Sequence, residues 1–252
     1  MHHNTEENMT KKQINRRNLI LGGGLAAASA LSASSAFSQQ VKQEPDSGSK
    51  PKVLPPPKTC EESMQRLIEG NKRFVSGKLN HPHSAMDWRK RLVGGQKPFV
   101  TIIGCADSRV PPELLFDQGF GDLFVIRVAG NVIDTDVAGS VEYGVDHLGT
   151  NLVVVMGHEG CGAVTAALQT ADDLKKEPNE IQALVGKIKP SIRKFESDTP
   201  FKQQLKTSVE DNVRNSVKLL KAIPDLAKAE KASKTKIVGT VYEIETGRVR
   251  RI

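Results

Sequence analysis

The sequence predicts an α/β protein with a mainly parallel central sheet, helices on both faces of that sheet and a C-terminal strand at its edge. Three short runs are almost uninterrupted apolar sequence, as in strands buried on both faces: residues 98–104, 123–128 and 152–156. The segments between and after these runs carry apolar residues at helical spacing. Buried strands that alternate with helices are typical of a parallel sheet covered on both sides.

The folded domain is expected to open with a helix near Thr59. Residues 59–62 (Thr-Cys-Glu-Glu) fit a capping box, and apolar residues then recur at helical spacing from Met64 to Phe74. The polar stretch that follows contains His81 and His83. These two histidines are spaced like a metal-binding pair, but we interpret the stretch as a solvated loop.

The later elements continue the alternation. We expect a helix at residues 137–148, between the second and third strands, and another after Gly160. Residues 179–226 are expected to be largely helical, with breaks at three prolines: Pro190, Pro200 and Pro224. Residues 236–244 return to strand character and are followed by a turn at Thr246-Gly247.

The first 38 residues have the order of a secretory signal peptide. Basic residues precede an uncharged run of apolar and small residues from Leu19 to about Ala36, where cleavage is expected. The pair Arg16-Arg17 resembles that of a twin-arginine signal. We therefore expect export to the periplasm, or to the thylakoid lumen in a photosynthetic organism. The alternative is an uncleaved anchor, for which a run of about 18 residues rich in Gly, Ala and Ser is short.

Composition sets the remaining domain boundaries and excludes some partners. Residues 39–57 are rich in Gln, Lys, Pro, Ser and Gly, so we expect a disordered linker there and a single folded domain at 58–252. A net charge of +7 without a basic block, and only 4% aromatic residues, argue against nucleic-acid binding. Once the signal is removed, we expect no stable membrane insertion. Three cysteines are too few for a disulfide scaffold.

Two of the predicted strands lead into residues that suit a metal. The first strand is followed by Cys105, Asp107 and Arg109, and the third by His158 and Cys161. Open parallel sheets place their chemistry at the carboxyl ends of strands, so we expect these residues to meet. Two thiolates and one imidazole suit zinc, and a fourth position left to water or to a weak ligand marks a catalytic zinc site.

Local geometry supports this interpretation, although each pattern has a plainer explanation. If residues 105–109 are extended, alternate side chains at 105, 107 and 109 point the same way. Cys161 is expected to open a helix, whose dipole favours the thiolate. However, cysteines at strand ends are often small buried hydrophobes, and Asp107 with Arg109 can form a purely structural ion pair.

Three segments carry a specific family resemblance: residues 105–113 (CADSRVPPE), 127–131 (RVAGN) and 157–164 (GHEGCGAV). In this order they resemble the signature sequences of the β-class carbonic anhydrases. The likeness runs from about residue 60 to the end of the chain, and it includes residues 70–74 and the closing strand at 237–242. The resemblance implies the β-carbonic anhydrase fold.

The resemblance also implies a zinc lyase. The expected reaction is reversible hydration of CO₂ to bicarbonate and a proton, by attack of a zinc-bound hydroxide. One Zn²⁺ per chain would be bound by Cys105, His158 and Cys161. Asp107 would be either the fourth ligand, which closes the site, or the partner of Arg109, which leaves a water on the zinc. Family members form dimers with the cleft at the interface, and these often pair into tetramers.

Four further residues are implied to contact the substrate. Gln96 would help to hold bicarbonate, Phe124 and Tyr143 would border the cleft, and the Gly162 amide would face a bicarbonate oxygen. One subclass of the family has a second bicarbonate pocket, made of Trp, Arg and Tyr, that shuts the enzyme at low pH. Arg127 and Tyr242 match two of these residues, but Ile102 stands in place of the Trp, so we expect no such switch.

Other functions remain open at this point. The same fold and ligands also serve hydrolases of carbonyl sulfide or carbon disulfide. A zinc-stabilised scaffold is a second alternative, although it would not require Gln96, Asp107 and Arg109. A redox pair of Cys105 and Cys161 is a third, which the absence of a Cys-x-x-Cys motif disfavours.

Overall fold

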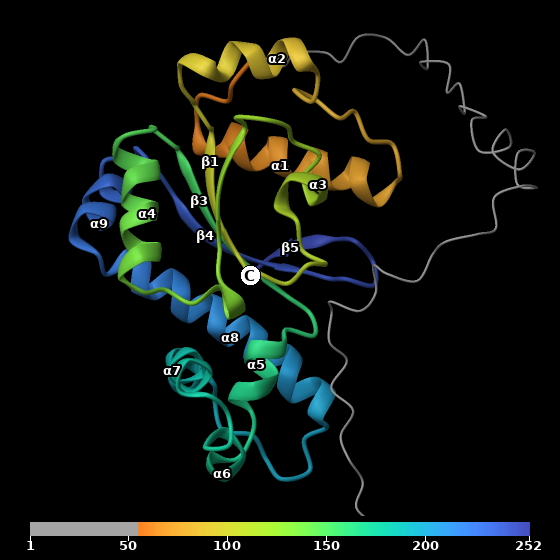
Figure 1. Ribbon diagram of the computed structural model, residues 1–252, viewed down its shortest axis with the longest axis vertical. Helices are drawn as coiled ribbons and strands as arrows, with labels where there is room; N and C mark the ends of the chain where they lie inside the picture. Colours follow the sequence, from red (N-terminus) through yellow and green to blue (C-terminus); the bar gives the residue numbers. More distant parts are fainter. Residues whose placement is uncertain (1–54) are drawn as a thin grey trace, which may run out of the picture. The chain divides into compact units, whose positions relative to one another are not determined.

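The computed structural model describes residues 55–252 (Figure 1). The predicted signal peptide and most of the predicted linker lie outside the described residues, so both stay predictions. Among residues 55–252, no helix is long and apolar enough to cross a membrane.

A five-stranded sheet forms the centre of the fold. Its strands are β1 (Val100–Gly104), β2 (Leu123–Arg127), β3 (Leu152–His158), β4 (Ile237–Tyr242) and β5 (Val249–Arg251). Their order is β2-β1-β3-β4-β5, in which β5 is antiparallel to β4 and all other neighbours are parallel. The mainly parallel sheet predicted from the sequence is confirmed. The strand predicted at 236–244 is β4, which lies inside the sheet, and β5 forms the C-terminal edge.

Helices cover both faces of this sheet, as predicted. They are α1 (Cys60–Val75), α2 (Met86–Arg91), α3 (Pro112–Leu115), α4 (Thr135–Asp146), α5 (Gly162–Ala167), α6 (Ala171–Leu174), α7 (Asn179–Ile188), α8 (Phe201–Lys221) and α9 (Pro224–Lys231). Short 3₁₀ turns lie at Leu92–Gly94, Ala129–Asn131 and Lys189–Ser191.

Alternate residues of the strands belong to two separate apolar cores. Ile102 and Val154 pack in a core that includes Leu67 of α1 and Leu115 of α3. Ile103 and Val155 pack in the other core, together with side chains of α4, α7, α8 and α9. In Figure 1, α1 and α3 accordingly lie on one side of the strands, and α4 and α8 on the other. Because both faces are covered, β1, β3 and β4 are buried along their whole length.

The helix boundaries follow from the local signals of the sequence. The capping box of α1 is confirmed, since Thr59 Oγ1 accepts the Glu62 amide at 3.1 Å and the Glu62 carboxylate accepts the Thr59 amide at 3.4 Å. The predicted proline breaks are also confirmed. Pro190 lies in the 3₁₀ turn after α7, Pro200 precedes α8, and Pro224 is the first residue of α9.

The topology brings two strand ends together. β1 and β3 are neighbours and parallel, with Gly104 opposite Met156, so the residues that follow β1 lie next to the end of β3. A close approach of α8 supports this end of β3 from behind. A Cβ atom on Gly157 would lie 2.5 Å from Cγ2 of Val213, so only glycine leaves room for α8 at this point.

Candidate metal centre

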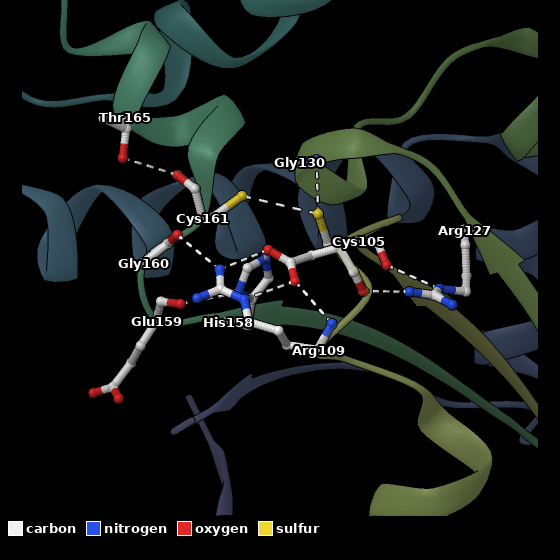
Figure 2. A network of polar contacts seen from close by, with 10 residues as sticks. Cys105, Arg109, Arg127, Gly130, His158, Glu159, Gly160, Cys161 and Thr165 are labelled. Atoms are coloured by element: carbon white, nitrogen blue, oxygen red, sulfur yellow. Dashed lines mark hydrogen bonds and ion pairs between the residues drawn. The ribbon is translucent and has the colours of Figure 1, made fainter. Parts of the chain in front are cut away.

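Three buried side chains form the centre of the candidate site (Figure 2). Cys105 follows β1, His158 ends β3, and Cys161 directly precedes α5. Their candidate ligand atoms all lie within 4.8 Å of one another, and the two Sγ atoms are 4.0 Å apart. Each of the three residues is at most 4% exposed. The three residues therefore lie together, as predicted from the sequence.

His158 presents a free nitrogen to the two sulfur atoms. Its Nδ1 donates a hydrogen bond to the Glu159 carbonyl oxygen at 2.9 Å, because a carbonyl can only accept. Nε2 is then the unprotonated nitrogen, and it is buried without a hydrogen-bond partner. A buried polar atom with no partner calls for an explanation, and a metal ion between the imidazole and the thiols supplies one.

The two thiols share their protons unequally. The Cys161 thiol lowers the pKa of Cys105 to about 4 by hydrogen bonding to its thiolate, and the Gly130 amide also favours that thiolate. Gly130 N donates to Cys105 Sγ at 3.3 Å. Conversely, sharing its proton with Cys105, together with burial, raises the pKa of Cys161. A bound divalent cation would remove this remaining proton, since the thiolate is the metal-binding form.

Asp107 and Arg109 form a close ion pair beside the three ligands. Oδ1 of Asp107 accepts the Arg109 amide and Nε, each at 2.9 Å, and Oδ2 accepts Nη2 at 2.7 Å. The Arg109 guanidinium holds the pKa of Asp107 well below its usual range. Oδ2 also lies 3.9 Å from His158 Nε2. Of the two arrangements expected for Asp107, the structure has the one in which it is paired with Arg109.

The expectation that residues 105–109 are extended is wrong for the last two residues. The chain turns after Asp107, and the Val110 amide donates to the Asp107 carbonyl oxygen at 3.1 Å. Arg109 therefore reaches its partner by folding back over its own loop, rather than by alternation along a strand.

Two contributions to the site were not predicted, and both come from residues 127–131. Arg127 Nε donates to the Cys105 carbonyl oxygen at 3.0 Å, and Arg127 Nη2 donates to that of Asp107. The Gly130 amide contacts the Cys105 sulfur, as described above. The motif Arg-Val-Ala-Gly-Asn was recognised in the sequence, but its spacing alone did not reveal these contacts.

The four predicted substrate-binding residues fall into two groups. Gly162 is the first residue of α5 and adjoins Cys161. Gln96 is exposed and precedes β1, and Phe124 is opposite Thr101 near the start of β2. Tyr143, which is 48% exposed, has its ring centroid 6.1 Å from that of Phe124. Gln96, Phe124 and Tyr143 thus lie toward the amino ends of β1 and β2, and one chain does not bring them to its own Cys105.

The structure corrects the expectation that His83 lies in a solvated loop. His83 is 7% exposed, its Nδ1 lies 2.9 Å from both carboxylate oxygens of Asp122, and its ring stacks on Trp88 with centroids 3.8 Å apart. Asp122 also pairs with the buried Arg66 at 3.3 Å. The polar sequence concealed this cluster because its polar side chains pair with one another inside the fold.

Comparisons with known proteins agree with this geometry. The sequence model of the family described as Carbonic anhydrase matches residues 100–249. Carbonic anhydrase 2 of Mycobacterium tuberculosis is 40% identical over 192 residues, which cover 74% of this chain and 89% of that protein. The solved β-carbonic anhydrase CcaA has a TM-score of 0.62 and 29% identity, and covers 75% of this chain and 87% of that one.

The fold is also shared with more distant solved structures. One of two tetrameric β-carbonic anhydrases from the ascomycete Sordaria macrospora has a TM-score of 0.62 at 23% identity. That likeness covers 75% of this chain and 96% of the other.

Proposed function

Because this chain belongs to the β class of the carbonic anhydrase family and is a carbonic anhydrase, we propose that it hydrates CO₂ reversibly. In this proposal one zinc ion is bound by Cys105, His158 and Cys161. The observation that supports the metal most directly is the buried His158 Nε2, which has no hydrogen-bond partner and lies with the two thiols. Two sulfurs and one imidazole nitrogen form a donor set that suits zinc and leaves one position open.

Zinc bound there would supply Lewis acidity, which makes a water molecule nucleophilic near neutral pH. The chain's own residues then have separate tasks. Arg109 keeps Asp107 ionised and holds both of its carboxylate oxygens. The carboxylate, close to His158 Nε2, can accept a hydrogen bond from the attacking water and so orient a lone pair of that water toward CO₂. Burial of the three ligands keeps bulk water away from them.

The substrate-binding side of the cleft comes, in this proposal, from a second copy of the chain. Gln96, Phe124 and Tyr143 lie too far toward the other end of the strands to serve their own Cys105. β2 is an edge strand that is only partly buried, unlike β1, β3 and β4. A partner that covers β2 would place these three side chains at an interface. A homodimer is the smallest such assembly, and a homotetramer, as in the Sordaria macrospora structures, is the next.

Export completes the proposal. The signal-like residues 1–38 would direct the chain through the twin-arginine route to the periplasm, or to the thylakoid lumen of a photosynthetic organism. That route carries folded proteins, which suits an enzyme that acquires its metal before export.

Stopped-flow CO₂ hydration from about pH 6.5 to 9, with zinc quantified on the same sample, tests the function. About one zinc per chain and a rate that rises with pH are expected, since hydroxide is the nucleophile. Zinc without CO₂ hydration would contradict the proposal and favour a hydrolase of carbonyl sulfide or carbon disulfide, to be assayed by sulfide release. A chain that binds no zinc would refute the ligand assignment.

A further inference from the structure

Arg127 connects an edge strand to the loop that carries Cys105 and Asp107. It is the last residue of β2, in register with Gly104 at the end of β1. Its guanidinium donates to the carbonyl oxygens of Cys105, at 3.0 Å, and of Asp107. Figure 2 shows Arg127 approaching the loop from the side opposite Arg109. One side chain thus holds the backbone of a metal ligand and of the catalytic carboxylate.

No other hydrogen bond within residues 55–252 ties the backbone of Asp107 to a neighbouring element. The other hydrogen bonds of Asp107 come from Arg109 and Val110, which belong to the same loop. Arg109 reaches outside this loop only through a long bond of 3.5 Å from Nη2 to the Gly160 carbonyl oxygen. The hydrogen bond from the Val128 amide anchors the carbonyl oxygen of Gly104, the last residue of β1, and does not reach the loop. The Gly130 amide contacts only the sulfur of Cys105.

The position of Asp107 matters because its carboxylate stands close to the metal ligands. Oδ2 is 3.9 Å from His158 Nε2. Carboxylate oxygen is itself a good zinc ligand, and a fourth protein ligand converts an open catalytic site into a closed structural one. A small shift of the loop would therefore let Asp107 occupy the position that the reacting water needs.

We propose that Arg127 is a positioning residue, which anchors the carbonyl groups of Cys105 and Asp107 to β2 and so keeps the Asp107 carboxylate on Arg109 and away from the metal. The inference rests on the zinc site of the proposed function. This anchoring role requires the hydrogen bonds to both carbonyl oxygens. A guanidinium can donate to two carbonyl oxygens in a fixed geometry, whereas an ammonium group cannot do so in the same way.

The loop should stay folded without this side chain. The bonds from Val128 to Gly104, from Val110 to Asp107 and from Gly130 to Cys105 are all donated by backbone amides. Arg127 is exposed, so its removal leaves no cavity and no buried polar atom of its own. Arg127→Met keeps the aliphatic stem and removes every donor, and Arg127→Lys keeps the charge and one donor group.

The test uses the cobalt-substituted enzyme and thiocyanate, an anion that can bind a metal with an open position. Visible spectra report thiocyanate binding without any turnover. We expect Arg127→Met to bind one cobalt per chain, as the parent does, but to bind thiocyanate at least about tenfold more weakly, the usual effect of losing a residue that orients a metal site. Arg127→Lys should fall between the two. The kcat for CO₂ hydration should fall with KM little changed.

A second pair of chains, both carrying Asp107→Ala, separates the positioning role of Arg127 from simple electrostatic attraction of thiocyanate by its charge. In chains that also carry Asp107→Ala, no carboxylate can fill the open position, so Arg127→Met should no longer weaken thiocyanate binding. Unchanged thiocyanate affinity in Arg127→Met would overturn the proposal, and so would a loss that Asp107→Ala does not restore. A parent chain that takes up no cobalt would instead refute the metal site on which the proposal rests.

Discussion

Gly70→Ala should destabilise the protein, although a glycine-to-alanine change inside a helix normally does the opposite. Gly70 lies within α1, where alanine is favoured over glycine by about 0.5–1 kcal/mol. However, a Cβ atom on Gly70 would lie 1.7 Å from the carbonyl oxygen of Phe116, against an ordinary contact of 3.4–4 Å. That oxygen belongs to the backbone, so it cannot rotate away as a side-chain end could.

Relief of this contact requires α1 and the end of α3 to separate. The same two segments are joined by a hydrogen bond from Asn71 Nδ2 to the Leu115 carbonyl oxygen at 3.0 Å, which the separation would stretch. Overpacking costs about 1–3 kcal/mol and a buried hydrogen bond contributes about 1 kcal/mol. After the gain in helix propensity, we expect a net loss of about 1–3.5 kcal/mol in the free energy of unfolding.

Gly186→Ala is the matched control. Gly186 is exposed within α7, and a Cβ atom there would have no neighbour within 4 Å. This variant should gain about 0.5–1 kcal/mol. Urea unfolding followed by far-UV circular dichroism, at one protein concentration and equal zinc content, measures both. A Gly70→Ala variant as stable as Gly186→Ala would refute the packing described for α1.

Three further outcomes follow from the structure. Asp107→Ala should keep zinc but lose most turnover, and full activity in stopped-flow assays of that variant would remove Asp107 from the mechanism. Thr59→Ala should cost about 1 kcal/mol in urea unfolding, because the amide of Glu62 loses its cap, whereas Thr199→Ala, outside any capping bond, should cost less. Arg109 lowers the pKa of Asp107, so the ionised carboxylate contributes stability that is fully present above its unfolded pKa of about 3.9 and is lost only as the pH falls further. Arg109→Ala should move that loss to higher pH. Carboxyl NMR titration of the parent and the variant measures the midpoint for Asp107, and an unmoved midpoint would contradict this reasoning.

The sequence predicted the fold because its strong signals are local. Short, β-branched apolar runs such as 152–156 are typical of strands buried on both faces of a sheet, and a proline such as Pro224 sets a helix boundary wherever the helix packs. The meeting of Cys105 with His158 was also predictable, since parallel neighbouring strands end at one edge. The first two inferences need only local sequence, and the third needs only that the two strands are parallel neighbours.

Other parts of the site depend on geometry that no spacing encodes. The return of Arg109 onto Asp107 depends on a turn, and the reach of Arg127 depends on which strand neighbours β1. The family pattern assigned Gln96 and Tyr143 to a cleft at a dimer interface, but only the strand register indicates that they lie far from Cys105 of the same chain. The burial of His83 depends on its contact with the carboxylate of Asp122, which is distant in the sequence.

The strand order has a consequence for how the chain is made. β4 fits between β3 and β5, yet it begins only at Ile237, long after β3 has ended at His158. While the ribosome is still adding the residues that precede it, one side of β3 has no strand to pair with, and apolar residues such as Val153 and Val155 lack their final cover. Native contacts of such long sequence separation form slowly, and unpaired strands are prone to aggregate. The nascent chain can therefore complete its sheet only after residues 237–242 have left the ribosome, and until then molecular chaperones have the most to protect.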